Sequence, residues 1–305
     1  MKLVFAGSPA AAVPTLRALA ASSHDVALVI TREDSPQGRK RVLTPTPVAA
    51  AAEELGIPVL RTNRLRAEAE DAVVGRGFDL GVIVAYGGLV REPLLSAPRL
   101  GWINLHFSLL PRWRGAAPVQ RALIAGDDVT GASVFQLVPE LDAGDVYGML
   151  TQQIGARETA GHLLDTLADA GAPLVTRVVD ALASGTARAE PQVGDVTLAP
   201  KLTLDDARLD WSEPAVMLDA RIRGVTPEPG AFTLLGGERF KIHEAHLARD
   251  AAALAPGAFA LREGRVLVGT GTHPLELVTV QPAGKKAMAA TDWWRGSGAE
   301  GLVAE

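Results

Sequence analysis

The sequence of 305 residues contains no cysteine. Disulfide bonds, thiolate nucleophiles and cysteine-ligated metal sites are therefore excluded, and the composition is typical of a reducing compartment. Long apolar runs are also missing, since none approaches the roughly 18 residues that a membrane-spanning helix needs. The first residues, 1–5, form a short apolar stretch that predicts a strand and not a signal peptide. We expect a cytoplasmic protein with no membrane partner.

An excess of positive charge is missing as well. The formal net charge is −5, whereas proteins that bind nucleic acid non-specifically usually carry surplus Lys and Arg. Any RNA partner must therefore meet a local positive surface. With 48% hydrophobic and 21% charged residues, the composition is that of a globular protein, and the length suffices for two domains.

Short apolar runs alternate with helical patterns through the first two hundred residues. This alternation predicts an α/β domain with a Rossmann-like, mostly parallel sheet. Residues 80–85 are apolar throughout, as expected for a strand covered by helices on both faces. We expect strands at 2–6, 26–30, 79–86, 102–105 and 132–138, and helices at 10–22, 47–55, 63–74 and 159–183. The last helix contains Pro173, which should kink it.

The pattern changes near residue 190. Residues 187–201 are polar and proline-rich without clear periodicity, which is typical of a linker. Short apolar runs with turn signals then follow at close spacing, which predicts a small all-β barrel or sandwich. These runs lie at 230–237, 239–243, 265–269 and 275–280. We therefore divide the chain into an α/β domain (1–190), a linker (191–204) and a β domain (205–305).

Three polar residues stand where predicted strands end. Asn104 and His106 are two residues apart, and this spacing puts both side chains on one face of a strand end. The strand predicted at 132–138 is followed by a Leu-Asp-Ala-Gly turn that carries Asp142. The sequence therefore predicts that an amide, an imidazole and a carboxylate converge.

These segments resemble the signature of the folate-dependent formyltransferases: Asn-x-His, then Ser-Leu-Leu-Pro, then Leu-Asp-x-Gly. Residues 112–118 extend the resemblance to the members that act on methionyl-tRNA, and it runs from residues 4–9 to residues 281–286. The resemblance implies a formyltransferase fold followed by a tRNA-binding barrel of the oligonucleotide-binding (OB) type. It also implies formyl transfer from 10-formyltetrahydrofolate to the α-amino group of methionine on initiator tRNA, for translation initiation.

Formyl transfer passes through a tetrahedral intermediate with negative charge on the former carbonyl oxygen. Asn104 supplies an amide donor for this oxyanion, and the His106 imidazole either donates to it or exchanges a proton with the leaving nitrogen. Asp142 holds the imidazole charged or takes the proton of the amine, directly or through water. Each residue alone is typical of a core histidine or a turn, but their combination predicts a catalytic set.

The resemblance also assigns the folate site. A flat pteridine needs an apolar slot with backbone groups at its edge. Gly88 is smaller and Phe107 larger than the usual family residues, which predicts a slightly reshaped pocket. Taken alone, residues 86–88 are typical of a turn that ends a strand. The segments that match the folate-binding positions of the family contain Tyr86, Gly87, Leu89, Ser108, Leu109, Leu110 and Pro111.

Basic residues cluster in two places. The first is a long polar segment, 32–47, of a kind usually found as a solvated loop. In the related tRNA enzymes the matching loop enters the acceptor arm, so we predict tRNA contacts from Arg39, Lys40 and Arg41. Arg112 and Arg114 flank Trp113 and suit a single-stranded 3′ end, although packing of Trp113 between solvated arginines explains this pattern equally well.

Two further patterns lack the spacing that their chemistry needs. His243 and His246 do not form the His-Glu-x-x-His of a zinc protease, and residues 7–9 lack Gly-x-Gly-x-x-Gly. We therefore expect neither a metal nor a dinucleotide cofactor, and we expect a monomer by default. Two alternatives stay open: formyl transfer to an amino sugar nucleotide or glycinamide ribonucleotide, and a non-catalytic RNA- or folate-binding protein.

Overall fold

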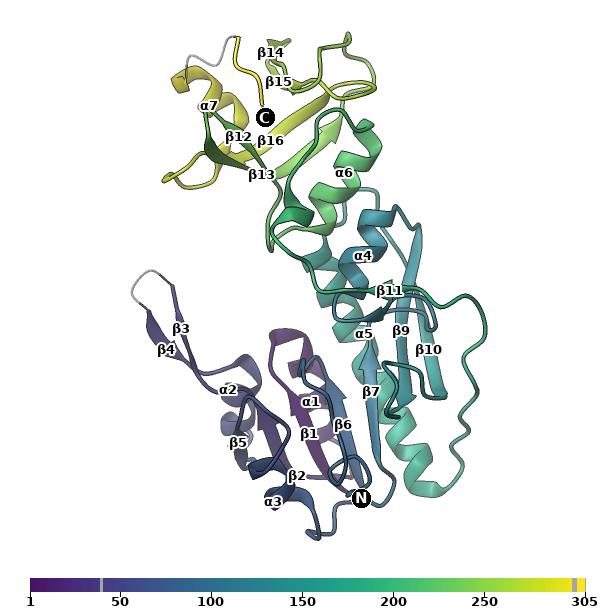
Figure 1. Cartoon of the computed structure of the whole chain (residues 1–305). Helices are drawn as coiled ribbons and strands as arrows, with labels where there is room; N and C mark the ends of the chain where they lie inside the picture. Colours follow the sequence, from purple (N-terminus) through teal and green to yellow (C-terminus); the bar gives the residue numbers. More distant parts are fainter. Residues whose placement is uncertain (39–40, 298–300, 305) are drawn as a thin grey trace. The chain divides into compact units, whose positions relative to one another are not determined.

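The computed structural model describes residues 1–38, 41–297 and 301–304 (Figure 1). The chain divides into two compact units. Unit 1 comprises residues 1–118, 129–153 and 164–199, and unit 2 comprises residues 119–128, 154–163 and 200–305. No helix of the described residues is long and apolar enough to cross a bilayer.

A seven-stranded sheet forms the centre of unit 1, in the order β10-β9-β7-β6-β1-β2-β5. The pairs from β7 to β5 are parallel, whereas β9 and β10 join antiparallel at one edge. The mostly parallel sheet of the predicted fold class is confirmed. The strands are β1 (Lys2–Gly7), β2 (Asp25–Thr31), β5 (Val59–Arg61), β6 (Leu80–Val84), β7 (Trp102–His106), β9 (Val129–Gln136) and β10 (Val146–Gln153).

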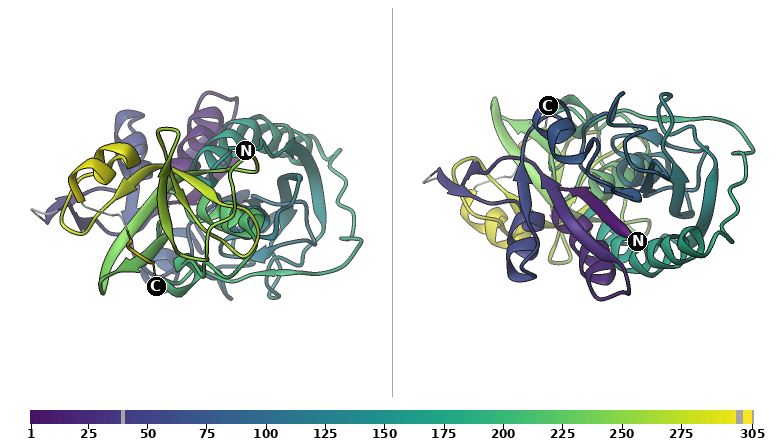
Figure 2. Two further views of the ribbon diagram at one scale, coloured as in Figure 1. Left: turned by 90° about the horizontal axis from the view of Figure 1, so that it is seen from above. Right: turned by 90° about the horizontal axis from the view of Figure 1, so that it is seen from below.

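Helices cover both faces of this sheet, as the fully buried strand β6 requires. Helices α1 and α5 lie on one face and α3 on the other (Figure 2). His24 after α1 bonds Asp180 of α5 at 2.8 Å, which ties the first two together. The helices that lie wholly or mainly in this unit are α1 (Val13–Ala20), α2 (Pro47–Glu54), α3 (Glu68–Val73) and α5 (Ala160–Ser184).

Several predicted elements differ in extent. The helix expected at 63–74 begins only at Glu68, because the Thr62 hydroxyl bonds both backbone groups of Arg64 and forms a turn. The helix expected at 10–22 opens with a 3₁₀ turn (Ala10–Ala12), whereas α5 continues through Pro173. The segment 32–47 is not simply a loop, since β3 (Ser35–Gln37) and β4 (Val42–Thr44) pair in it as a hairpin.

Unit 2 contains a six-stranded antiparallel sheet in the order β12-β13-β16-β15-β14, with β17 paired to β16. This sheet agrees with the expected OB-type barrel domain. Helices α4 (Pro118–Ala125), α6 (Ala215–Gly224) and α7 (Ala290–Ser297) were not predicted. Trp293 of α7 packs against Phe240 and Phe259 in the core. The strands are β12 (Phe232–Leu235), β13 (Glu238–Leu247), β14 (Phe259–Arg262), β15 (Arg265–Val268), β16 (Leu275–Gln281) and β17 (Met288–Ala289).

Candidate active site

Asn104 and His106 occupy the end of β7, at the carboxyl edge of the parallel strands. Asn104 is in register with Ile83 of β6 and Phe135 of β9. Asp142 comes from the turn after β9, and its Oδ2 lies 3.7 Å from Nδ1 of His106. The structure thus brings the amide, the imidazole and the carboxylate to one edge of the sheet.

The His106 ring is buried, and its surroundings fix where its proton resides. Nε2 lies 2.8 Å from the backbone carbonyl of Trp113, which can only accept a hydrogen bond, so Nε2 carries a proton. Burial lowers the pKa of His106 below that of a free histidine, and the Asp142 charge opposes this effect. The ring at rest is therefore neutral, with an unprotonated Nδ1 on the side of Asp142.

Asp142 is held rigidly, in a left-handed backbone conformation with φ of +47°. Its Oδ2 accepts a hydrogen bond from the backbone N–H of Gly115 at 2.8 Å. Two residues on, Gly144 passes so close to β9 that a Cβ there would lie 1.8 Å from the Gln136 carbonyl oxygen. The turn therefore requires glycine at position 144, in agreement with the Leu-Asp-x-Gly motif.

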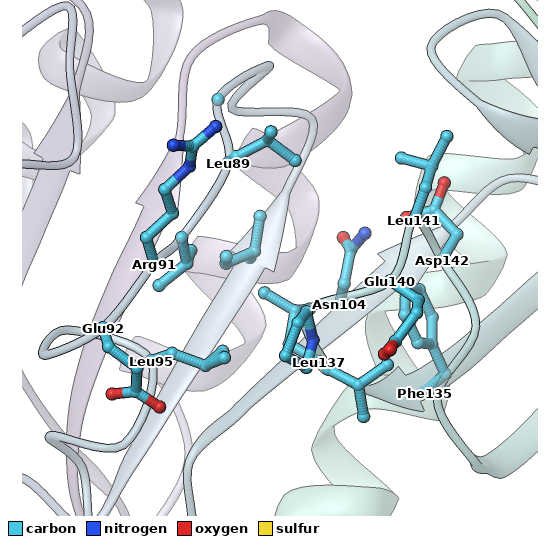
Figure 3. Close-up of a pocket in the computed structure, with 15 residues that line it drawn as sticks. Leu89, Arg91, Glu92, Leu95, Asn104, Phe135, Leu137, Glu140, Leu141 and Asp142 are labelled. Atoms are coloured by element: carbon cyan, nitrogen blue, oxygen red, sulfur yellow. The ribbon is translucent and has the colours of Figure 1, made fainter.

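Two adjoining cavities, each of about 380 Å³, open on this edge and share Asn104, Leu89, Leu141 and Asp142 in their linings. Figure 3 shows the first, with Asn104 between Leu89 on one side and Leu141 and Asp142 on the other. The first cavity is lined mainly by apolar side chains, which come from β6 and the segment after it and from β9 and the turn after it: Ile83, Leu89, Val90, Leu95, Phe135, Leu137, Val138 and Leu141. The second adds His106, Phe107, Gly115 and Ala116.

The side-chain oxygen of Asn104 accepts no hydrogen bond from the described residues. Among the described residues, its Oδ1 is one of few buried side-chain atoms without a hydrogen-bond partner. Buried polar atoms are normally paired, so an unpaired oxygen on a residue that lines two cavities suits a site whose hydrogen bonds a ligand completes.

The predicted folate residues fall into two groups. Tyr86, Gly87 and Leu89 line the second cavity, but the Tyr86 hydroxyl is engaged, since it donates to the Thr62 carbonyl at 2.6 Å. Within the described chain, the linings of both cavities leave out the turn 108–111. This turn is fastened to β9 instead, because the Ser133 hydroxyl bonds the carbonyl of Ser108 and the N–H of Leu110. A folate role for 108–111 stays a prediction.

Of the predicted tRNA residues, Arg41, Arg112 and Arg114 are absent from the linings of both cavities. Arg39 and Lys40 fall outside the described residues, and Arg41 is exposed at the turn of the β3–β4 hairpin. The Arg112 guanidinium stacks on the Trp113 ring at 4.6 Å, and Arg114 bonds Gln192. Contacts of these arginines with tRNA stay a prediction.

His243 and His246, whose spacing does not fit a zinc site, each contact a neighbouring side chain in unit 2. Nε2 of His243 contacts Gln281 at 3.0 Å, and Nε2 of His246 contacts Glu244 at 3.1 Å. Within residues 1–38, 41–297 and 301–304, no group of three or more His, Asp or Glu side chains could hold a metal ion.

Sequence reasoning missed two residues behind the site, Gln192 and Thr197. Gln192 bonds the turn of Asp142, and Thr197 bonds the residue that accepts from His106. Both lie in the polar stretch interpreted as a linker, where no periodicity marks them. The strand β11 (Leu198–Ala199), which pairs with β8 (Arg114–Gly115), is likewise too short to be recognised.

Comparisons with known proteins place the whole chain in a family. Residues 1–179 match the family described as "Formyl transferase", and residues 201–298 match "Formyl transferase, C-terminal domain". A methionyl-tRNA formyltransferase of Clavibacter sepedonicus is 62% identical over 304 residues, covering 100% of both chains. Another, of Leifsonia xyli subsp. xyli, is 65% identical over 303 residues, covering 99% of this chain and 100% of the relative.

A solved structure shows the same fold at low identity. The N-formyltransferase from Helicobacter canadensis, in complex with folinic acid and dTDP-3-aminofucose, matches 92% of this chain and 99% of its own. The TM-score is 0.69 and the identity 14%. The resemblance noted in the sequence is thus confirmed. The chain belongs to the formyltransferase family, and methionyl-tRNA formyltransferases match it from end to end.

Proposed function

We propose that this protein transfers a formyl group from 10-formyltetrahydrofolate to the α-amino group of methionine on initiator methionyl-tRNA. The observation that carries the chemistry is the convergence of Asn104, His106 and Asp142 where two cavities meet. The acceptor follows from the full-length relatives at 62% and 65% identity, which are named methionyl-tRNA formyltransferase. A protein of this kind serves translation initiation.

Each cavity receives one substrate. The first has the apolar lining that a flat pteridine needs, so it takes the folate cosubstrate; of the predicted folate residues Leu89 lines it, whereas Tyr86 and Gly87 line only the second. The second holds His106 and takes the methionine end of the tRNA. Asn104 and Asp142 line both cavities, which puts them where the formyl group crosses from one substrate to the other.

Asn104 acts on the carbonyl oxygen. As the amine attacks the formyl carbon, this oxygen gains negative charge, and the amide N–H₂ donates to it. Asn104 belongs to a central strand, so its side chain needs little reorganisation when the charge develops. Such preorganised donors stabilise the transition state more than the ground state.

His106 and Asp142 carry one proton from the attacking amine to the leaving nitrogen. The attacking amine loses a proton and the departing N10 of the folate gains one, so the transfer is balanced without an external acid. The neutral His106 accepts this proton at Nδ1, because Nε2 already donates to Trp113. Asp142, 3.7 Å away, stabilises the resulting imidazolium until the proton passes to N10.

The alternatives are less well supported. The structural match to an enzyme solved with an amino sugar nucleotide shows the fold alone, at 14% identity. A non-catalytic binder has no use for a buried histidine and carboxylate at the meeting point of two cavities. We also propose that the protein is a cytoplasmic monomer, and that Arg39, Lys40 and Arg41 contact the tRNA.

The test is formyl transfer from 10-formyltetrahydrofolate to methionine charged on initiator tRNA. Charged elongator tRNA and free methionine are the controls. We expect strong preference for the initiator. Folate binding without transfer to any tRNA would contradict the proposed acceptor and favour a sugar or nucleotide amine.

A further inference from the structure

The segment 192–199 touches the supports of both His106 and Asp142. Gln192 Nε2 donates to the backbone carbonyl of Asp142 at 2.8 Å and to that of Gly144 at 2.9 Å. Its Oε1 accepts from the Arg114 guanidinium at 3.0 and 2.6 Å. One amide therefore joins the turn of Asp142 to the segment after His106.

The orientation of the Gln192 amide is fixed by its partners. Reversed, the amide would place its oxygen against two carbonyl oxygens and its N–H₂ against a guanidinium that only donates. A carboxylate at this position would keep the bond to Arg114 but repel both carbonyls. The site is thus specific for a neutral side chain that donates at one end and accepts at the other.

Thr197 supports His106 in a similar way. Its Oγ1 accepts from the backbone N–H of Trp113 at 2.9 Å, and the Trp113 carbonyl accepts from Nε2 of His106 at 2.8 Å. Trp113 has a φ of +63°, a conformation that non-glycine residues adopt only when their surroundings hold them there. Thr197 therefore bonds the residue whose carbonyl sets the tautomer of His106.

Hydrophobic packing does not explain why this segment lies where it does. Val193, Val196 and Leu198 are 88%, 53% and 63% exposed. Apart from the buried Ala199, the segment is held mainly by hydrogen bonds: its backbone pairs with residues 111–117, and the side chains of Gln192 and Thr197 bond the supports of the site.

We propose that Gln192 and Thr197 are positioning residues for formyl transfer. Gln192 fixes the turn that carries Asp142, and Thr197 fixes the carbonyl that orients His106. The proposal rests on the proposed function. A displacement of about 1 Å in a catalytic group can lower the rate about 100-fold, so these contacts act on kcat more than on substrate binding.

The first test compares Gln192→Met, which keeps length and charge, with Gln192→Glu, which keeps the Arg114 bond. Val193→Ala is the matched control, since it alters an exposed neighbour. We expect both Gln192 variants to lose about 10- to 100-fold in kcat with KM values within about twofold. A kcat equal to that of Val193→Ala would overturn the role of Gln192. For Thr197, we expect Thr197→Val to lose kcat and Thr197→Ser, which retains the hydroxyl, to keep it.

A double-mutant cycle separates positioning from general damage. If Gln192 acts through Asp142, Gln192→Met should change kcat less than about twofold in an Asp142→Asn background. Equal losses in both backgrounds would overturn the proposal, because they would show that Gln192 acts independently of Asp142.

A third measurement does not depend on turnover. The pKa of His106 in the free protein, followed by NMR, reports the Asp142 charge, which is the charged group acting on the ring. We expect Gln192→Met to lower this pKa toward the value in Asp142→Asn, whereas an unchanged pKa would contradict the positioning role of Gln192. If the wild-type protein formylated no tRNA, the proposed function would fail, and this titration would still decide the positioning role.

Discussion

The end of β7 and the β3–β4 hairpin belong to the same unit but differ in how firmly they are held. In β7 all five residues are buried or half-buried, and His106 is fixed by a hydrogen bond at Nε2 and a carboxylate beside Nδ1. In the hairpin every residue of β3 and β4 is exposed. Bond making thus falls to groups with fixed geometry, whereas the exposed hairpin offers a surface for recognition.

The largest effect is expected at Asn104. Asn104→Ala removes the oxyanion donor while leaving β7 paired on both sides, so we expect kcat to fall by roughly 100- to 1000-fold or more. Substrate binding should change far less. Single-turnover formylation and folate binding, measured on the same variant, check this. Near-normal turnover would remove Asn104 from the mechanism.

The next effect concerns the proton. Because His106 accepts at Nδ1 only when neutral, kcat should rise with pH through the His106 pKa, which lies below that of free histidine. Asp142→Asn removes the charge that opposes burial, so the pKa falls further and the acid limb moves to lower pH. We expect kcat on the plateau to fall about 100-fold, because the imidazolium loses its partner. An acid limb that moves to higher pH would contradict this assignment.

In the β3–β4 hairpin we expect substitutions to change tRNA binding and not the chemical step. Replacing Arg39, Lys40 and Arg41 by Ala should raise the KM for tRNA about tenfold and reduce its dependence on salt, because each lost phosphate contact releases one counterion fewer. Folate binding should not change. Arg17→Ala combined with Arg99→Ala, at exposed ion pairs elsewhere in the unit, is the control. Unchanged kinetics with tRNA would contradict the proposed tRNA contacts of these three residues.

The sequence predicted the strands and the catalytic residues better than it predicted Gln192 and Thr197, which support them. Short apolar runs predicted β6 and β7, helical periodicity predicted α5, and motif spacing predicted that Asn104, His106 and Asp142 converge. The supports were missed because Gln192 and Thr197 act through side-chain hydrogen bonds from an aperiodic segment, which leaves no pattern in the sequence. Helices α6 and α7 were missed because only short stretches of α6 and α7 are apolar, and tertiary packing on the sheet decides their structure.

The smallest effect is expected at Tyr86, one of the predicted folate residues. The Tyr86 hydroxyl is buried and donates to the Thr62 carbonyl at 2.6 Å, so Tyr86→Phe leaves that carbonyl without its donor. We expect a loss of roughly 1–3 kcal/mol in stability with little change in folate affinity. Val42→Ser in the hairpin, where the side chain is 60% exposed, should change stability by less than about 0.5 kcal/mol. Urea unfolding of both variants, beside folate titration, checks this. Weaker folate binding with unchanged unfolding in Tyr86→Phe would show that its hydroxyl serves the ligand and not the fold.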